Sequence, residues 1–187
     1  MNLKVFNDFP VLETERLILR QIEVGDAAFI HFMRTDNIVN QHVKREPTLN
    51  ISDAKNFIRL RQEDFKNKYA IYWSITVKTT GSMIGSLSIW HINITESLAE
   101  LGYDLHPSSQ GQGYMNEAAR AAITFGFEEM ELKCIFAITS PSNSPSQKVL
   151  KTLDFEIMEE SEMPPEDVAN GLLGFKIESP EIVAGVS

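Results

Sequence analysis

The first 70 residues show one short apolar run followed by two segments with helical periodicity. Residues 11–22 contain an apolar run between charged residues, which predicts a strand. Helical spacing follows directly, and Asp26 stands where its carboxylate could cap the first helix. Ser52 or Asp53 is the expected cap of a second helix. The inner face of that helix is expected to consist of Phe57, Ile58, Arg61 and Phe65. We expect a strand and two helices here, the helices joined by a loop over residues 41–50.

The pattern changes at residue 71 to segments rich in aromatic and β-branched residues. Such segments at 71–77, 83–92 and 98–105 predict three strands, and short turn sequences between them favour an antiparallel meander. Gly85 lies inside the second of these strands. A glycine at such a position predicts a bulge or the close approach of another backbone.

Helices and strands alternate in the last third of the chain. Residues 114–130 predict a helix with one face of small residues, which lets a helix lie close to a sheet. Residues 134–138 form an apolar run without alternation, as expected for a strand buried on both faces. A short helix at 144–153 and strands at 155–158 and 172–177 complete the pattern. The chain is therefore expected to adopt an α+β fold, with an antiparallel half followed by a β-α-β-α-β half.

Length, charge and cysteine content exclude several classes of protein. The 187 residues fit a single domain over 1–187, with enough apolar residues (43%) to form a core. The net charge of −9 argues against a nucleic-acid partner and slightly favours a cationic substrate. Cys134 is the only cysteine, so neither an internal disulfide nor a cysteine metal cluster can form. The histidines lack metal-ligand spacing, and no metal is expected.

No part of the sequence resembles a membrane segment. No stretch approaches the ~20 apolar residues that a membrane helix needs, and the first residues show no apolar targeting segment. We therefore expect a cytoplasmic protein without a membrane partner.

The segment that points to chemistry is a loop with two glycines between an expected strand and a long helix. It reads Gln110-Gly111-Gln112-Gly113-Tyr114-Met115. Backbone N–H groups of such a loop can point to one place, and the helix N-terminus adds roughly half a positive charge. This predicts a pyrophosphate site made from backbone. The loop lacks the Lys-Ser/Thr of a P-loop, and Asn116 replaces the third glycine of a dinucleotide motif. A loop that merely turns the chain is the alternative.

Four segments, in the right order, resemble the GNAT superfamily of N-acetyltransferases, and most closely its RimJ/RimL-like branch. The loop matches the family pattern Q/R-x-x-G-x-G/A except at Met115, where Ala or Gly is usual. Residues 12–20 resemble the branch's opening L-x-T-E-R-L-x-L-R, and residues 99–107 its A-E-I-G-Y-x-L-x-P. Residues 143–155 resemble N-x-x-S-x-x-V-L-x-x-x-G-F, with Asp154 in place of glycine. Asp tolerates a left-handed helix end, so this difference is compatible with the pattern. The match fades after Phe155.

The resemblance implies both a fold and a reaction. The fold would have a mixed, mainly antiparallel sheet flanked by helices, with splayed central strands. The reaction would transfer an acetyl group from acetyl-CoA to a primary amine by direct attack, without a metal. The strand around Tyr103, Asp104 and Leu105 would pair with the pantetheine arm, and the Leu105 N–H would polarise the thioester. The pyrophosphate would be held by Gln110, Gly111, Gln112, Gly113, Tyr114 and Met115, and the pantetheine by Asn143.

The resemblance also suggests catalytic residues, each with a structural alternative. Ser146 would donate a proton to the leaving thiolate; otherwise it is a polar residue in the first turn of a helix. Glu100 would accept the amine proton; otherwise it is a solvent-facing strand residue. Glu166 or Asp167 could replace Glu100 as the base. The acceptor site in the family is shaped by the region after the first helix, here with Arg34, His42 and Lys44, although a solvated loop is the favoured interpretation.

Two classes of function remain open at this point. The first is an N-acetyltransferase acting on a protein N-terminus, a polyamine, an amino acid or another small amine. The second is a non-catalytic acyl-CoA-binding module that serves as a sensor or interaction domain. A nucleotide-phosphate enzyme is disfavoured because the loop lacks the Lys-Ser/Thr pair. By family analogy the chain is a monomer or a homodimer.

Overall fold

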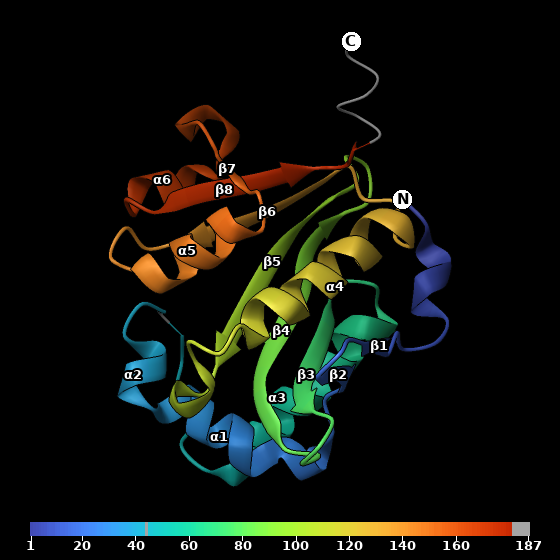
Figure 1. Cartoon of the computed structure of the whole chain (residues 1–187), viewed down its shortest axis with the longest axis vertical. Helices are drawn as coiled ribbons and strands as arrows, with labels where there is room; N and C mark the ends of the chain where they lie inside the picture. Colours follow the sequence, from blue (N-terminus) through green and yellow to red (C-terminus); the bar gives the residue numbers. More distant parts are fainter. Residues whose placement is uncertain (44, 181–187) are drawn as a thin grey trace.

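The computed structural model describes residues 1–43 and 45–180 and has an eight-stranded sheet at its centre (Figure 1). The strand order is β1-β2-β3-β4-β5-β6-β8-β7, and only β5 and β6 are parallel neighbours. The strands are β1 (Leu12–Glu13), β2 (Leu17–Gln21), β3 (Ile71–Val77), β4 (Met83–Asn93), β5 (Leu98–Leu105), β6 (Cys134–Thr139), β7 (Glu156–Ile157) and β8 (Leu173–Glu178). This mixed, mainly antiparallel sheet confirms the expected α+β architecture.

Helices cover both faces of the sheet and create two apolar layers. They are α1 (Ala27–Thr35), α2 (Asn37–Asn40), α3 (Ile51–Lys66), α4 (Tyr114–Glu128), α5 (Ser144–Thr152) and α6 (Pro165–Ala169). The larger core lies between α4 and the sheet, where Ala118, Ala119 and Ala122 are fully buried. The smaller core joins α1 to α3 through Ile30 and Ile58. Figure 1 shows α4 in front of the sheet and α3 behind it.

The central strands β5 and β6 part after a short parallel ladder. Their last paired residues are Glu100 and Phe136, although β5 continues to Leu105 and β6 to Thr139. Beyond Glu100, β5 pairs with β4 alone among the residues that the structure describes. This confirms the splayed central strands that the resemblance implied.

The register of β4 and β5 fixes which backbone groups face this opening. His106 N–H donates to Ile84 O at 2.8 Å, and Gly85 is the next pair, opposite Leu105. Because hydrogen-bonded and non-hydrogen-bonded pairs alternate in an antiparallel ladder, the backbone groups of Tyr103 and Leu105 point away from β4. Those of Asp104 point toward β4. The splay therefore exposes every second peptide group of β5.

The structure corrects two strand expectations. Residues 11–22 form the two strands β1 and β2 rather than one, because Thr14 turns the chain: its N–H donates to Leu17 O at 3.0 Å and its Oγ1 accepts from Leu17 N–H at 3.0 Å. Strand β6 alternates in burial, so the expectation of burial on both faces is wrong. Ile135 is buried in the core, whereas Ile138 lines the opening next to β5.

The expected helix caps are also corrected. Asn50, rather than Ser52 or Asp53, caps α3: its Oδ1 accepts from Asp53 N–H at 3.1 Å, and Asp53 reciprocates as the third residue of a capping box. Asp26 does precede α1, but its carboxylate makes no cap there and instead binds Arg20, at 2.8 Å. The short helices α2 and α6 were not expected from the sequence. Asp154 has φ +63°, the left-handed conformation anticipated for it.

Gly85 lies where β5 approaches β4 most closely. A Cβ atom at this position would overlap the Asp104 carbonyl oxygen, and the register of β3 shifts between Ile75 and Thr76 next to it. We expect Gly85→Ala to lower the free energy of unfolding by about 1–3 kcal/mol, since backbone must move to admit the methyl group.

Urea unfolding followed by circular dichroism measures this change. Gly25→Ala is the matched control, because nothing lies within 4 Å of a Cβ there, and its effect should stay within about 0.5 kcal/mol. An unchanged unfolding midpoint for Gly85→Ala would contradict the close approach of the two strands.

Candidate active site

A cavity of about 370 Å³ lies where β5 and β6 part, and we call it the sheet-opening cavity. It brings together five of the residues singled out from the sequence, on β5 and at the start of α5. They are Glu100, Tyr103, Asp104, Asn143 and Ser146. Its other walls come from β3, β4, α1, α3 and the loop before α3. The glycine loop, residues 110–115, is not part of this lining and lies between the end of β5 and the start of α4.

The backbone of the glycine loop has the conformation that an anion site needs. Gly111 and Gly113 have φ +73° and +79°, a region that residues with a Cβ rarely adopt. Gly113 is the N-cap of α4 and supplies no side-chain cap, so the first amides of α4 face the loop without one. The side chain of Met115 is buried in the core and does not fill the loop. The loop therefore combines the N-terminus of α4 with backbone N–H groups that no side chain of the N-cap residue occupies.

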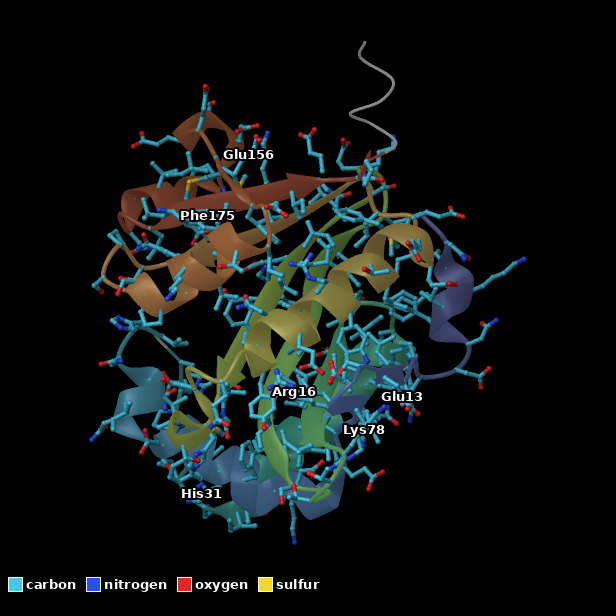
Figure 2. The ribbon with its side chains drawn as sticks, viewed as in Figure 1. Glu13, Arg16, His31, Lys78, Glu156 and Phe175 are labelled. Carbon is cyan, nitrogen blue, oxygen red and sulfur yellow. The ribbon has the colours of Figure 1, made fainter. Side chains whose placement is uncertain are left out.

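The charged side chain of Arg16, from the turn between β1 and β2, lies against this loop. The Arg16 Nη1 donates to Gln112 O at 3.1 Å, and its guanidinium carbon lies 4.4 Å from the centroid of the Tyr114 ring (Figure 2). Arg16 Nε also donates to Glu117 Oε2 at 2.6 Å. We call this the Arg16–Glu117 contact. It places a guanidinium group beside the loop, a role that sequence reasoning missed although Arg16 lies in the matched segment 12–20.

Glu117 is held ionised by this contact. Burial alone would raise the pKa of its carboxyl, but hydrogen bonds from Thr14 Oγ1 and from the Arg16 backbone and side chain lower it below its ordinary value. The contact therefore joins the hairpin of β1 and β2 to the first turn of α4.

Tyr103 and Ser146 form a hydroxyl pair at the sheet-opening cavity. Their oxygens are 3.0 Å apart. Burial raises the pKa of Tyr103 to about 12, so its phenol stays protonated at neutral pH and can donate. Asn143 caps α5 by accepting from Ser146 N–H at 3.2 Å, which fixes the first turn that carries Ser146. Sequence reasoning had considered Tyr103 only for its backbone.

Glu100 is a buried carboxylate at the point where the two strands part. Its side chain is 13% exposed, and His91 Nδ1 lies 2.8 Å from its Oε2. Burial raises the pKa of Glu100, the hydrogen bond from His91 opposes that rise, and the charge of Asp167 on α6 adds to it. A carboxylate with a raised pKa in a cavity is a stronger proton acceptor than an exposed one.

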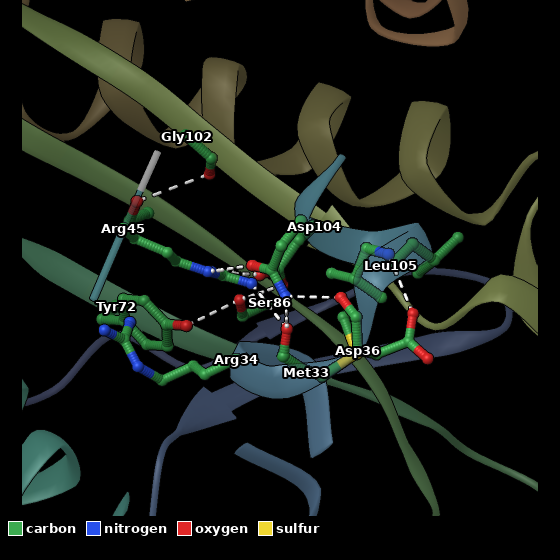
Figure 3. A network of polar contacts seen from close by, with 12 residues as sticks. Met33, Arg34, Asp36, Arg45, Tyr72, Ser86, Gly102, Asp104 and Leu105 are labelled. Atoms are coloured by element: carbon green, nitrogen blue, oxygen red, sulfur yellow. Dashed lines mark hydrogen bonds and ion pairs between the residues drawn. The ribbon is translucent and has the colours of Figure 1, made fainter. Parts of the chain in front are cut away.

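Asp104 anchors the segment before α3 to the sheet. Arg45 Nη1 donates to Asp104 Oδ2 at 2.9 Å, and Ser86 Oγ donates to Oδ1 at 2.5 Å (Figure 3). Tyr72 OH donates in turn to Ser86 Oγ at 2.7 Å, and Arg45 also donates to Met33 O at 2.8 Å. With its backbone directed toward β4, Asp104 contributes its side chain to the opposite face of the sheet from Tyr103.

The resemblance placed Arg34, His42 and Lys44 near the acceptor site, and Arg34 lines the sheet-opening cavity. His42 lines the sheet-opening cavity and its Nδ1 lies 3.1 Å from Ser142 Oγ. Lys44 lies outside the described residues.

Across residues 1–43 and 45–180, no helix has the length and apolar character needed to cross a membrane. Nor do three His, Cys, Asp or Glu side chains gather in this part of the chain as a metal ion would require.

Comparison with known proteins gives relatives along most of the chain. Residues 16–156 match the family model of the acetyltransferase (GNAT) domain. The uncharacterized N-acetyltransferase p20 of Bacillus licheniformis is 34% identical over 145 residues, which cover 78% of this chain and 82% of that protein. Spermidine N(1)-acetyltransferase of Escherichia coli (strain K12) is 25% identical over 156 residues, covering 82% of this chain and 78% of that one.

Solved structures show the same fold. The RimL acetyltransferase of ribosomal L7/L12, solved in complex with coenzyme A, matches with a TM-score of 0.76 at 19% identity, covering 91% of this chain and 98% of that one. The family model spans most of the chain, and the splayed sheet and glycine loop agree with it. The chain therefore belongs to the GNAT family of acetyltransferases and is an N-acetyltransferase.

Proposed function

We propose that this enzyme transfers the acetyl group of acetyl-CoA to a primary amine by direct attack inside the sheet-opening cavity. The observation that carries the proposal is the parting of β5 and β6 beyond Glu100 and Phe136. It leaves the outward peptide group of Tyr103 beside a cavity that also holds Glu100 and Ser146, and next to it the outward N–H of Leu105, whose oxygen accepts from Gln110 Nε2 at 3.1 Å. Peptide groups of a strand require hydrogen-bond partners, and the amides of a pantetheine arm are suited to supply them.

Binding of acetyl-CoA would use two separate parts of the structure. The pyrophosphate would bind to the amides of the glycine loop and the first turn of α4, where the helix dipole favours an anion. The Arg16 guanidinium, next to Gln112 O, would add a positive charge. The N–H of Leu105 would then polarise the thioester carbonyl.

The reaction needs one proton acceptor and one proton donor. The amine nitrogen attacks the thioester carbon, the carbon–sulfur bond breaks and an amide forms. The proton of the amine passes to Glu100, directly or through a water, and the thiolate takes a proton from the Tyr103–Ser146 pair. We assign Ser146 as the donor nearest the sulfur, with Tyr103 OH re-protonating it across 3.0 Å. Solvent then returns a proton to Tyr103, and Glu100 releases the proton of the amine to solvent.

The glycine loop is tested by Gly113→Glu. A carboxylate at this N-cap would repel the pyrophosphate and place a side chain where the phosphate should approach. We expect acetyl-CoA to bind about 100-fold more weakly or worse, measured by titration calorimetry. Gly81→Glu is the matched control, since Gly81 also has a positive φ (+67°) in open space but lies in the β3–β4 turn.

Equal acetyl-CoA affinity of Gly113→Glu and the parent would contradict a phosphate site in this loop. Micromolar binding by the parent without turnover of any amine would instead favour the non-catalytic acyl-CoA-binding module.

The hydroxyl pair is tested by Ser146→Ala and Tyr103→Phe. Each change removes one proton donor from the path to the thiolate, so kcat should fall by roughly 10- to 100-fold for each variant. The Kd for acetyl-CoA should change little. Ser144→Ala, on the exposed side of the same helical turn, should keep the parent kcat. A kcat within twofold of the parent for both test variants would remove the pair from the mechanism.

The base is tested by the pH dependence of kcat/KM in Glu100→Gln and His91→Asn. Glu100 must be deprotonated to accept a proton, so activity should fall as the pH drops through its raised pKa. His91 lowers that pKa, so His91→Asn should move the acidic limb to higher pH, and Glu100→Gln should leave only the limb that the acceptor amine itself produces. Asn suits position 91 because His91 has φ +46°.

The ionisation of the acceptor amine is common to all variants and cancels in this comparison. Glu96→Gln, in the exposed turn between β4 and β5, should leave the profile unchanged. An acidic limb that stays in place in both Glu100→Gln and His91→Asn would assign the base to another group, with Asp167 the next candidate.

A further inference from the structure

Three arginines line the wall of the sheet-opening cavity that is formed by α1, α3 and the loop between them. Arg34 comes from α1, Arg61 from α3 and Arg45 from the loop between them. The guanidinium carbons of Arg34 and Arg61 lie 4.4 and 5.1 Å from the centroid of the Phe57 ring. The aromatic ring thus holds two guanidinium groups in fixed positions beside one cavity.

The charges of these arginines are unequally compensated. Arg45 pairs with Asp104 at 2.9 Å and Arg61 with Asp64 at 2.8 Å. Within residues 1–43 and 45–180, Arg34 makes no ion pair, and its Nη2 donates to the backbone oxygen of Glu46 at 2.6 Å. Burial and the nearby charges of Arg45 and Arg61 lower the pKa of Arg34. The cavity wall therefore carries a net positive charge without a protein counter-ion.

The same wall has hydrogen-bond donors that the protein does not use. In the described part of the chain, three buried N–H groups on the cavity have no partner: Arg34 Nε, Arg61 Nε and Trp90 Nε1. A buried donor without an acceptor costs free energy, and the cost is larger for a charged group. These unpaired N–H dipoles add to the positive potential on this side of the cavity and so favour an anion there.

We propose that the acceptor carries a carboxylate close to its reacting amine, and that Arg34, supported by Arg61, binds this carboxylate. A guanidinium binds a carboxylate through two parallel N–H···O bonds, which fixes the orientation of the acceptor as well as its affinity. The amine of the same molecule would then lie toward Glu100, the carboxylate on the β5 wall of the cavity. This inference rests on the proposed function and deepens it by naming the acceptor class.

The local charge of the cavity outweighs the net charge of the chain in choosing an acceptor. A net charge of −9 slightly favours a cationic acceptor, such as a polyamine. A polyamine would place a second cation beside the uncompensated Arg34, at close range and partly out of water, where repulsion is stronger than at the surface. A zwitterion meets Glu100 with its amine and Arg34 with its carboxylate, so both charged groups find partners.

The inference is tested with matched pairs of acceptors. The pairs are L-glutamine against L-glutamine α-amide, L-methionine against L-methioninamide, and the peptide amides Asp-Ala-Ala against Asn-Ala-Ala, with spermidine as the cationic reference. In the parent, the carboxylate member of at least one pair should have a kcat/KM at least tenfold above its neutral partner. The amino-acid pairs and the peptide pair separate an α-carboxylate from a side-chain carboxylate as its source.

The variants assign that preference to Arg34. Arg34→Gln should reduce the carboxylate preference to about unity, mainly through KM, and Arg34→Lys, which keeps the charge but loses the fork, should retain part of it. Arg59→Gln removes the same charge from the exposed side of α3 and should keep the full preference. Urea unfolding of each variant separates a loss of preference from a loss of fold.

The possible failures of the inference and of the proposed function differ. Acetylation with the neutral partners or spermidine preferred, or a carboxylate preference unchanged in Arg34→Gln, would overturn the carboxylate site while leaving the acetyltransferase mechanism intact. An absence of turnover with every acceptor, despite acetyl-CoA binding, would overturn both.

Discussion

The rest of this structure depends on one short parallel ladder. Strands β5 and β6 pair over three residues each and then diverge, so β5 presents peptide groups that the sheet itself does not satisfy. Elsewhere, such groups would invite water or another strand. Here, the start of α5 lines the opening through Asn143 and Ser146, and α1 and α3 line it through Arg34, Phe57 and Arg61. A substrate that enters along β5 can therefore be contacted from both faces of the sheet.

The two faces divide the chemistry between them. Odd-numbered residues of β5 face the α4 side, where Tyr103 meets Ser146, while Glu100 and Asp104 face the side of α1 and α3. The alternation of a strand thus separates the groups suited to the thiolate from those suited to the amine. The same alternation lets one residue, Asp104, tie the loop before α3 to the sheet through Arg45 without entering the ladder toward β6.

Local patterns were sufficient to predict the strands at 71–77 and 98–105 and the glycine loop. The parting of the central strands was predicted through the resemblance to the family. Local patterns failed where a choice depended on distant partners. Tyr103, for example, meets Ser146 across 43 residues. The cap of α3 was a different error, because the local capping box of Asn50 and Asp53 begins one residue before the expected helix start. The positive cavity wall also escaped prediction, because the stacking of Arg34 on Phe57 depends on how α1 packs against α3. An average charge of the chain says nothing about such a local excess.

The Arg16–Glu117 contact has a consequence for the order in which the protein becomes competent. It joins residues 101 positions apart, so the glycine loop is braced only after the hairpin of β1 and β2 has docked on α4. Such long-range contacts form late because the entropy of closing the intervening chain must first be offset. During synthesis the hairpin thereby waits for a helix that is made about a hundred residues after it, and a fully braced loop is a mark of completed folding.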